Sequence, residues 1–143
     1  MSRVDFYILS DGTSIDRFAC NIAAKAWSKG NRVHIHTQSE QMAENIDSLL
    51  WTYRDISFVP HEIFFGEVSQ ETLVTIGFSE QYPESTQVII NLDNDIPDFV
   101  NNFDRIIEIA GGNESTKQLA RQRYRKYKDD NYEIHDHKID SLK

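Results

Sequence analysis

The fold is decided by residues 4–37, VDFYILSDGTSIDRFACNIAAKAWSKGNRVHIHT. Residues 4–9 are a short run rich in aromatic and aliphatic side chains, and the turn-forming residues 10–12 end it, so the run predicts a strand. In residues 14–28 the apolar side chains recur at steps of three and four, which indicates a helix. Residues 32–37 predict a second strand. Strand, helix and strand in this order favour a parallel βαβ unit with a right-handed crossover.

The rest of the chain continues the alternation of helices and strands. Short apolar runs predict further strands at residues 73–78, 87–92 and 105–110. Helices are expected at residues 40–51, 97–103 and 113–128, the last capped by Asn113 or Ser115. Residues 57–66 are apolar but too irregular to assign. We therefore expect a single α/β domain over residues 1–143, with a mostly parallel or mixed central sheet flanked by helices and a loosely held polar tail at 129–143.

The net charge is −8, but it is unevenly distributed. Residues 1–112 contain 7 Lys and Arg against 17 Asp and Glu, whereas residues 114–128 contain six basic residues and Glu114 alone. An acidic protein is not generally attracted to duplex DNA or to anionic membranes, so contact with a polyanion must be local. The single cysteine, Cys20, excludes an internal disulfide and a cysteine-based zinc site. No signal peptide or membrane span is recognisable, so we expect a cytoplasmic protein.

The basic helix has one face that combines cations with an aromatic ring. At about 100° per residue, one arc of roughly 100° contains Lys117, Arg121, Tyr124, Arg125 and Lys128. Such a face suits a ligand that carries carboxylates or phosphates together with an apolar group. The alternative interpretation is a solvated helix with ordinary surface charges.

Motifs for catalysis or cofactor binding are absent from the sequence. The turn at residues 10–16 lacks the glycine spacing of a dinucleotide site, and the chain has no Gly-Lys-Ser/Thr phosphate loop. His34 and His36 share one face of a strand, but without a third ligand a surface pair is favoured over a metal site. Asp5 precedes its apolar run, at the wrong sheet edge for an acidic pocket. We therefore expect no catalytic residues, no metal and no cofactor.

Two large aromatic residues, Trp51 and Phe58, flank one connection after the second predicted helix. Aromatic side chains placed in this way often anchor a protein partner. Alternatively, both side chains complete the core of the domain.

Several segments together resemble a known protein family. They are Phe6-Tyr7-Ile8-Leu9, Ala23-Ala24-Lys25-Ala26-Trp27, Gly30-Asn31-Arg32-Val33, Leu50-Trp51, Ser57-Phe58-Val59-Pro60-His61 and residues 117–127, KQLARQRYRKY. In this order they resemble the chi subunit of bacterial DNA polymerase III. The resemblance covers most of the chain and implies a Rossmann-like fold with no bound nucleotide.

The resemblance also implies a function, that of a non-enzymatic adaptor. Such an adaptor pairs with the psi subunit of the clamp loader and binds the C-terminal tail of the single-stranded-DNA-binding protein, so that it meets DNA only indirectly. That tail is acidic and ends in Pro-Phe with a free carboxylate. By motif position, Lys117, Arg121, Tyr124, Arg125 and Lys128 would bind the tail and Trp51 and Phe58 would bind psi, with a helicase-like protein as another occupant of the psi surface.

Two other functional classes stay open on the sequence. One is a small α/β enzyme whose basic helix holds a phosphorylated or acidic substrate, although no nucleophile or metal site can be named. The other is a direct single-stranded nucleic-acid-binding module, in which Tyr124 stacks on a base and the arginines contact phosphates. The acidic charge of residues 1–112 argues against it.

Overall fold

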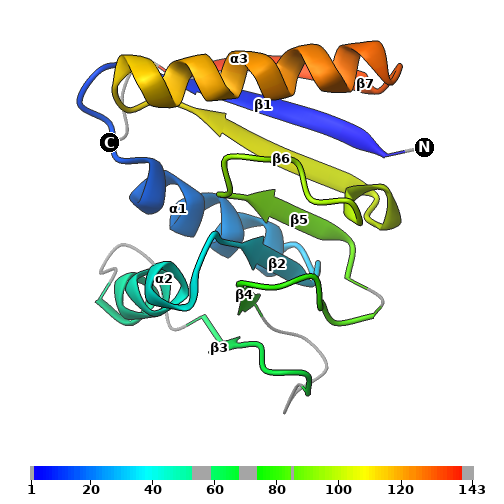
Figure 1. Ribbon diagram of the computed structural model, residues 1–143. Coiled ribbons are helices and arrows are strands. Elements are labelled where there is room, and N and C mark those ends of the chain that lie inside the picture. Colours follow the sequence, from blue (N-terminus) through cyan, green and yellow to red (C-terminus); the bar gives the residue numbers. More distant parts are fainter. Residues whose placement is uncertain (1, 53–58, 68–73, 85, 140–143) are drawn as a thin grey trace.

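The computed structural model describes residues 2–52, 59–67, 74–84 and 86–139. Within these residues a seven-stranded sheet has the order β3-β4-β2-β5-β6-β1-β7, and its strand pairs are parallel (Figure 1). The strands are β1 (Arg3–Leu9), β2 (Val33–His36), β3 (His61–Ile63), β4 (Val74–Gly77), β5 (Val88–Asn91), β6 (Arg105–Ala110) and β7 (Glu133–Ile139). The predicted α/β class is thus confirmed, with a parallel rather than a mixed sheet.

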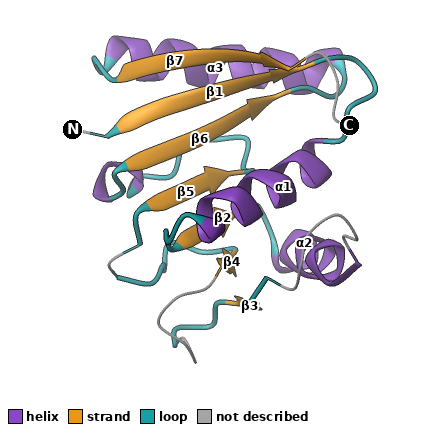
Figure 2. Cartoon of the chain, turned by 180° about the vertical axis from the view of Figure 1, so that it is seen from behind, coloured by secondary structure: helices purple, strands orange, loops and turns teal. Residues whose placement is uncertain are grey.

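Helices cover both faces of the sheet. Helices α1 (Ile15–Ser28) and α2 (Glu40–Thr52) lie on one face, and α3 (Glu114–Asp129) lies on the other, across β1 and β7 (Figures 1 and 2). The 3-10 turn η1 (Val100–Asn102) packs on the α3 side, and it is much shorter than the helix predicted for residues 97–103. Each face of the sheet therefore has its own apolar core.

The two cores follow from the alternation of side chains along the strands. On the α1 and α2 side, Ile35, Ile76 and Ile90 are fully buried, together with Phe18 of α1. On the α3 side, the core contains strand residues whose side chains point to the opposite face of the sheet, including Phe6 and Ile106. Strands β2, β4 and β5 are buried along their whole length, so their polar residues, among them His34, Thr75 and Asn91, are buried as well.

The C-terminal segment corrects the sequence prediction. Residues 129–143 are expected to be a loose polar tail, but Glu133–Ile139 form β7 and pair in parallel with the whole of β1. The turn before β7 contains Asn131, with a positive φ of 64° that asparagine tolerates better than most residues. Because β7 is an edge strand with half-exposed side chains, it needs few apolar residues. Ile134 and Ile139 alone pack against the two cores, so its sequence reads as polar.

Residues 57–66, which the sequence does not assign, contain a second edge strand. β3 pairs in parallel with β4, where His61 lies beside Val74 and Ile63 beside Ile76. Three residues are too short a run for a recognisable apolar pattern.

Candidate functional site

Helix α3 begins directly after the end of β6 and is capped by Asn113. The Asn113 side chain accepts hydrogen bonds from the backbone N–H and the hydroxyl of Thr116, both at 2.9 Å. Of the two caps that the sequence allows, Asn113 is therefore the observed one, and Ser115 lies inside the helix. The helix then runs over β1 and β7, so its residues face the α3-side core.

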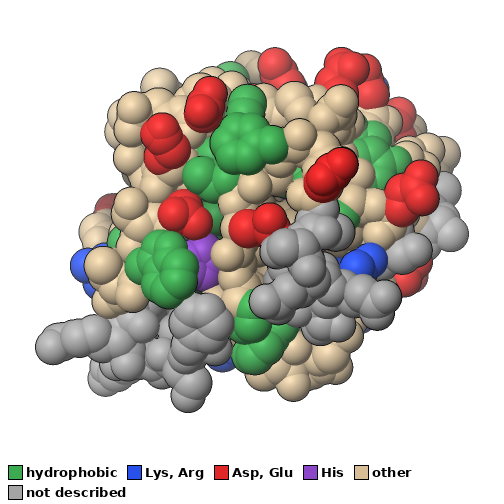
Figure 3. Space-filling view, turned by 90° about the horizontal axis from the view of Figure 1, so that it is seen from below, with side chains coloured by type: hydrophobic (Ala, Val, Ile, Leu, Met, Phe, Trp, Pro, Cys, Tyr) green, Lys and Arg blue, Asp and Glu red, His purple; other side chains and the backbone are tan. Residues whose placement is uncertain are grey.

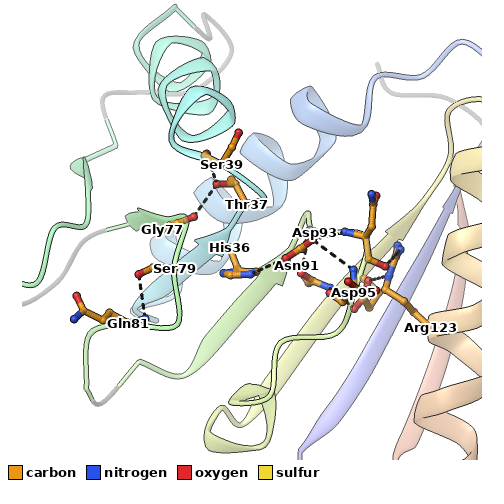
Figure 4. Close-up of polar contacts among 12 residues, drawn as sticks. His36, Thr37, Ser39, Gly77, Ser79, Gln81, Asn91, Asp93, Asp95 and Arg123 are labelled. Carbon is orange, nitrogen blue, oxygen red and sulfur yellow. Dashed lines mark hydrogen bonds and ion pairs between the residues drawn. The ribbon is translucent and has the colours of Figure 1, made fainter.

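A buried polar network fixes the rotation of α3 against the sheet. Glu108 of β6 is fully buried, and its Oε1 accepts a hydrogen bond from Arg123 Nε at 2.9 Å. Its Oε2 accepts from the Tyr127 hydroxyl at 2.7 Å and from the Asn91 amide at 2.9 Å. Burial raises the pKa of Glu108, and the Arg123 charge opposes that rise. Arg123 also donates to the Asn94 carbonyl, reaching from α3 to the loop after β5 (Figure 4).

With this rotation, α3 and β1 enclose a pocket of about 330 Å³. Three of the five predicted residues line it: Lys117, Arg121 and Tyr124. The rest of its lining is apolar and comes from β1, β6 and α3, namely Phe6, Ile8, Leu9, Ala110 and Ala120. The sequence analysis missed this apolar lining, although the alternation of Phe6 and Ile8 on one face of a strand is a visible signal.

The other two predicted residues lie elsewhere on the helix. Arg125 borders a separate hollow of about 210 Å³ with Gln122, Lys126 and Asp129. Lys128 is exposed and lines neither of these two pockets.

The pocket lies beside two neighbouring strands, β1 and β6, whose following helices lie on opposite faces of the sheet. Strands β1 and β6 are neighbours, but the chain leaves β1 toward α1 on one face and leaves β6 toward α3 on the other. In open α/β sheets such a switch point, beyond the carboxyl ends of the strands, is the usual place for a ligand. Leu9 and Ala110, the last residues of the two strands, both line the pocket.

The polar groups of the pocket are partly held by neighbours. Lys117 Nζ donates to Asp11 Oδ1 at 2.9 Å, and this bond lowers the pKa of Asp11 and raises the pKa of Lys117. The Arg121 side chain is 56% exposed and donates to Gln118 Oε1 at 3.1 Å. The Tyr124 ring packs edge-on against Phe6, with centroids 5.1 Å apart, and its hydroxyl donates to Asp136. The pocket thus presents an apolar surface beside two cations, which suits an apolar group attached to a carboxylate.

A second candidate surface surrounds Trp51 at the end of α2. Trp51 is 60% exposed, and its ring packs edge-on against that of His61 with centroids 4.7 Å apart. Phe58, the other predicted residue of this surface, lies outside the described residues. Phe65, which the sequence analysis did not select, is 69% exposed and packs against Phe78. On this side of the molecule, hydrophobic side chains are interspersed with acidic ones (Figure 3).

The remaining candidate groups have structural contacts. His34 is fully buried and hydrogen-bonded to Thr75, and burial lowers its pKa to about 3. His36 is also buried and pairs with Asp93 at 3.2 Å (Figure 4), so the expected surface pair of histidines is wrong. Burial raises the pKa of Cys20 to about 12. Within the described residues, no group of three or more side chains could hold a metal ion.

The Asp5 carboxylate is likewise occupied by its neighbours. It is buried between Arg105, at 2.5 Å, and Arg3, at 3.0 Å, and His137 lies 2.8 Å away. It forms no acidic pocket with Asp11, whose carboxylate lies beside Lys117.

In the described part of the chain, no helix is long and apolar enough to span a membrane.

Comparison with known proteins gives a consistent family. The model of the family described as DNA polymerase III chi subunit, HolC, matches residues 1–135. The chain is 33% identical over 141 residues to DNA polymerase III subunit chi of Pseudomonas aeruginosa, covering 97% of this chain and 98% of that protein. It is 36% identical over 124 residues to the Haemophilus influenzae subunit of the same name, covering 84% and 85%.

A solved structure also shares the fold. The crystal structure of T4 UvsW matches 98% of this chain and 42% of its own, with a TM-score of 0.68 and 8% identity, which shows similarity of fold alone. The family match and the two relatives carry the assignment, and the chain belongs to the DNA polymerase III chi subunit family.

Proposed function

We propose that this chain is a non-catalytic, cytoplasmic adaptor of the DNA polymerase III holoenzyme. It links the psi subunit of the clamp loader to the acidic C-terminal tail of the single-stranded-DNA-binding protein during DNA replication. The observation that carries the proposal is the pocket between α3 and β1, where an apolar lining meets Lys117 and Arg121. A peptide that ends in an apolar residue with a free carboxylate, preceded by acidic residues, has the complementary chemistry.

In this proposal the two parts of the pocket bind different parts of the tail. The apolar end of the tail lies on Phe6, Ile8 and the Tyr124 ring, which face the same pocket. Its terminal carboxylate accepts hydrogen bonds from Arg121, whose planar guanidinium can bind a carboxylate through two parallel bonds. Arg125 and Lys128 lie farther along α3 and steer the acidic residues of the tail, without bordering the pocket.

The psi subunit occupies the other surface, which contains Trp51 and, by the family resemblance, Phe58. An exposed tryptophan on a helix end is a typical interface anchor. In Figure 1 this helix, α2, lies at the opposite end of the sheet from α3, so the two partners do not compete for space. A helicase-like protein is an alternative occupant of the psi surface.

Charge favours a protein ligand over direct binding of nucleic acid. The basic residues are concentrated on α3, whereas the face around α2 and β3 carries many acidic side chains (Figure 3). A long polyanion that contacts α3 would be repelled by the rest of the surface, but a short acidic peptide would not. The protein therefore meets DNA indirectly, through its partners.

One titration separates the proposed function from its competitors. We expect an acidic peptide ending in Pro-Phe to bind in calorimetry, and a single-stranded oligonucleotide of the same charge to bind much more weakly at equal salt. Replacing Trp51 and Phe58 together by alanine should abolish capture of psi and leave peptide binding unchanged. Tighter binding of the oligonucleotide would instead support a nucleic-acid-binding module.

A further inference from the structure

The carboxylate nearest to the cations of the pocket belongs to the protein itself. Asp11 Oδ1 accepts a hydrogen bond from Lys117 Nζ at 2.9 Å, although the two residues are 106 positions apart. The Asp11 side chain is 91% exposed, whereas that of Lys117 is only 28% exposed. The Lys117 side chain is therefore largely covered by protein, and its ion-pair partner, Asp11, lies on the side that faces solvent.

The turn after β1 holds Asp11 in this place. The Thr13 amide donates to the Ser10 carbonyl at 3.2 Å, and Gly12 adopts a positive φ of 84°. The Ser14 hydroxyl then caps α1 by accepting from the Arg17 amide at 3.2 Å. The turn is thus fixed between the end of β1 and the start of α1, beside the first turns of α3.

We propose that Asp11 competes with the ligand of the pocket: it occupies Lys117 until the carboxylate of a ligand displaces it. This inference rests on the proposed function of the pocket as a tail-binding site. Replacing one carboxylate by another at Lys117 changes the energy little. A ligand therefore gains mainly from the apolar lining and from Arg121, whose own carboxylate neighbour, Glu114, is farther away, at 3.9 Å. The cost of displacing Asp11 is the same for every acidic ligand, so one without an apolar end binds weakly and one that also fills the apolar lining binds more tightly.

The test measures peptide affinity by calorimetry in wild type and in Asp11→Asn. An exposed ion pair is weak, so we expect Asp11→Asn to tighten binding of an acidic peptide ending in Pro-Phe by about twofold to fivefold. A peptide without the final Phe displaces the same carboxylate and should gain by the same factor. The matched control is Asp130→Asn, which also removes one carboxylate from an ion pair with a lysine. Asp130 Oδ2 lies 3.4 Å from Lys126 Nζ, and neither residue lines the pocket. It should leave both affinities unchanged.

The Lys117→Met background tests whether the effect passes through Lys117. There, Asp11→Asn should no longer tighten binding. An equal gain from Asp11→Asn and Asp130→Asn, or a gain that persists in Lys117→Met, would mean that Asp11 acts only through net charge and would overturn the inference.

Failure of the inference is distinguishable from failure of the proposed function. Peptide binding that Arg121→Ala does not weaken would refute the pocket as the tail site, whatever Asp11 does. Titration of the Asp11 carboxyl by NMR gives a readout that needs no peptide. The pKa of Asp11 should rise in Lys117→Met, and an unchanged pKa would show that the contact does not form in solution.

Discussion

Breaking the buried pair beneath α3 should destabilise the protein strongly, and more so at neutral pH than in acid. Arg123→Met removes the cation from Glu108, which is fully buried, and leaves it only the Tyr127 hydroxyl and the Asn91 amide. Removing one member of a buried pair costs on the order of 3 to 5 kcal/mol of unfolding free energy. Loss of Arg123 also raises the pKa of Glu108 further above its ordinary value of 4.5.

The sign of the pH dependence follows from proton binding. A raised folded-state pKa means that the folded protein holds the Glu108 proton to higher pH than the unfolded chain does. Stability therefore decreases as the pH rises above about 4.5, and the decrease ends once the folded-state pKa is passed. Relative to wild type, the loss in Arg123→Met should be larger at pH 7.5 than at pH 5, as measured by urea unfolding at both values.

Two further variants control this prediction. Arg125→Met removes an exposed arginine from the same helix and should change stability by about 0.5 kcal/mol or less. Adding Glu108→Gln to Arg123→Met removes the uncompensated carboxylate and should abolish the extra loss at neutral pH. A cost of Arg123→Met below about 1 kcal/mol, or one independent of pH, would refute the view that this pair holds α3 in place.

Three other variants test the surfaces and the core. Arg121→Ala should weaken acidic-peptide binding by about tenfold to thirtyfold and Lys128→Ala by less than threefold, because Arg121 borders the pocket and Lys128 does not; equal losses in calorimetry would contradict this difference. Trp51→Ala should lower capture of psi in a pull-down while leaving the thermal midpoint within a few degrees, since the side chain is mostly exposed; a large fall in the midpoint would place it in the core. Gly77→Ala should cost about 1 to 3 kcal/mol in urea unfolding, because the new Cβ would meet the buried His34 ring at 2.6 Å; an unchanged midpoint would mean that the ring moves freely.

Most elements of the fold are readable from local patterns. The apolar spacing of α1 and the runs of β2, β4 and β5 predict these elements to within a few residues. The edge strands β3 and β7 escape prediction because strands that pack weakly need little apolar character. Their pairing partners, β4 and β1, lie elsewhere in the sequence.

The sequence also identifies the basic helix and leaves Arg123 off its predicted binding face, but it gives no partner for this residue. Arg123 is one of a run of similar residues, and only the structure shows that it is buried against Glu108. Its neighbours Arg121 and Arg125 are exposed. A charge pattern gives the composition of a helix face, whereas the contacts of that helix with the sheet decide which cation points inward.

By itself, then, the sequence determined the α/β class, the acidic charge of residues 1–112 and the basic, tyrosine-containing helix. These properties depend on residue type and on spacings of a few positions, which a single chain displays directly. Only the tertiary structure decided which apolar residues share a pocket with the cations of α3, namely Phe6 and Ile8 beside Lys117, Arg121 and Tyr124. It also decided that Asp11 accepts a hydrogen bond from Lys117. Those contacts join segments about a hundred residues apart, and the order of the strands in the sheet, which local patterns do not specify, brings them together.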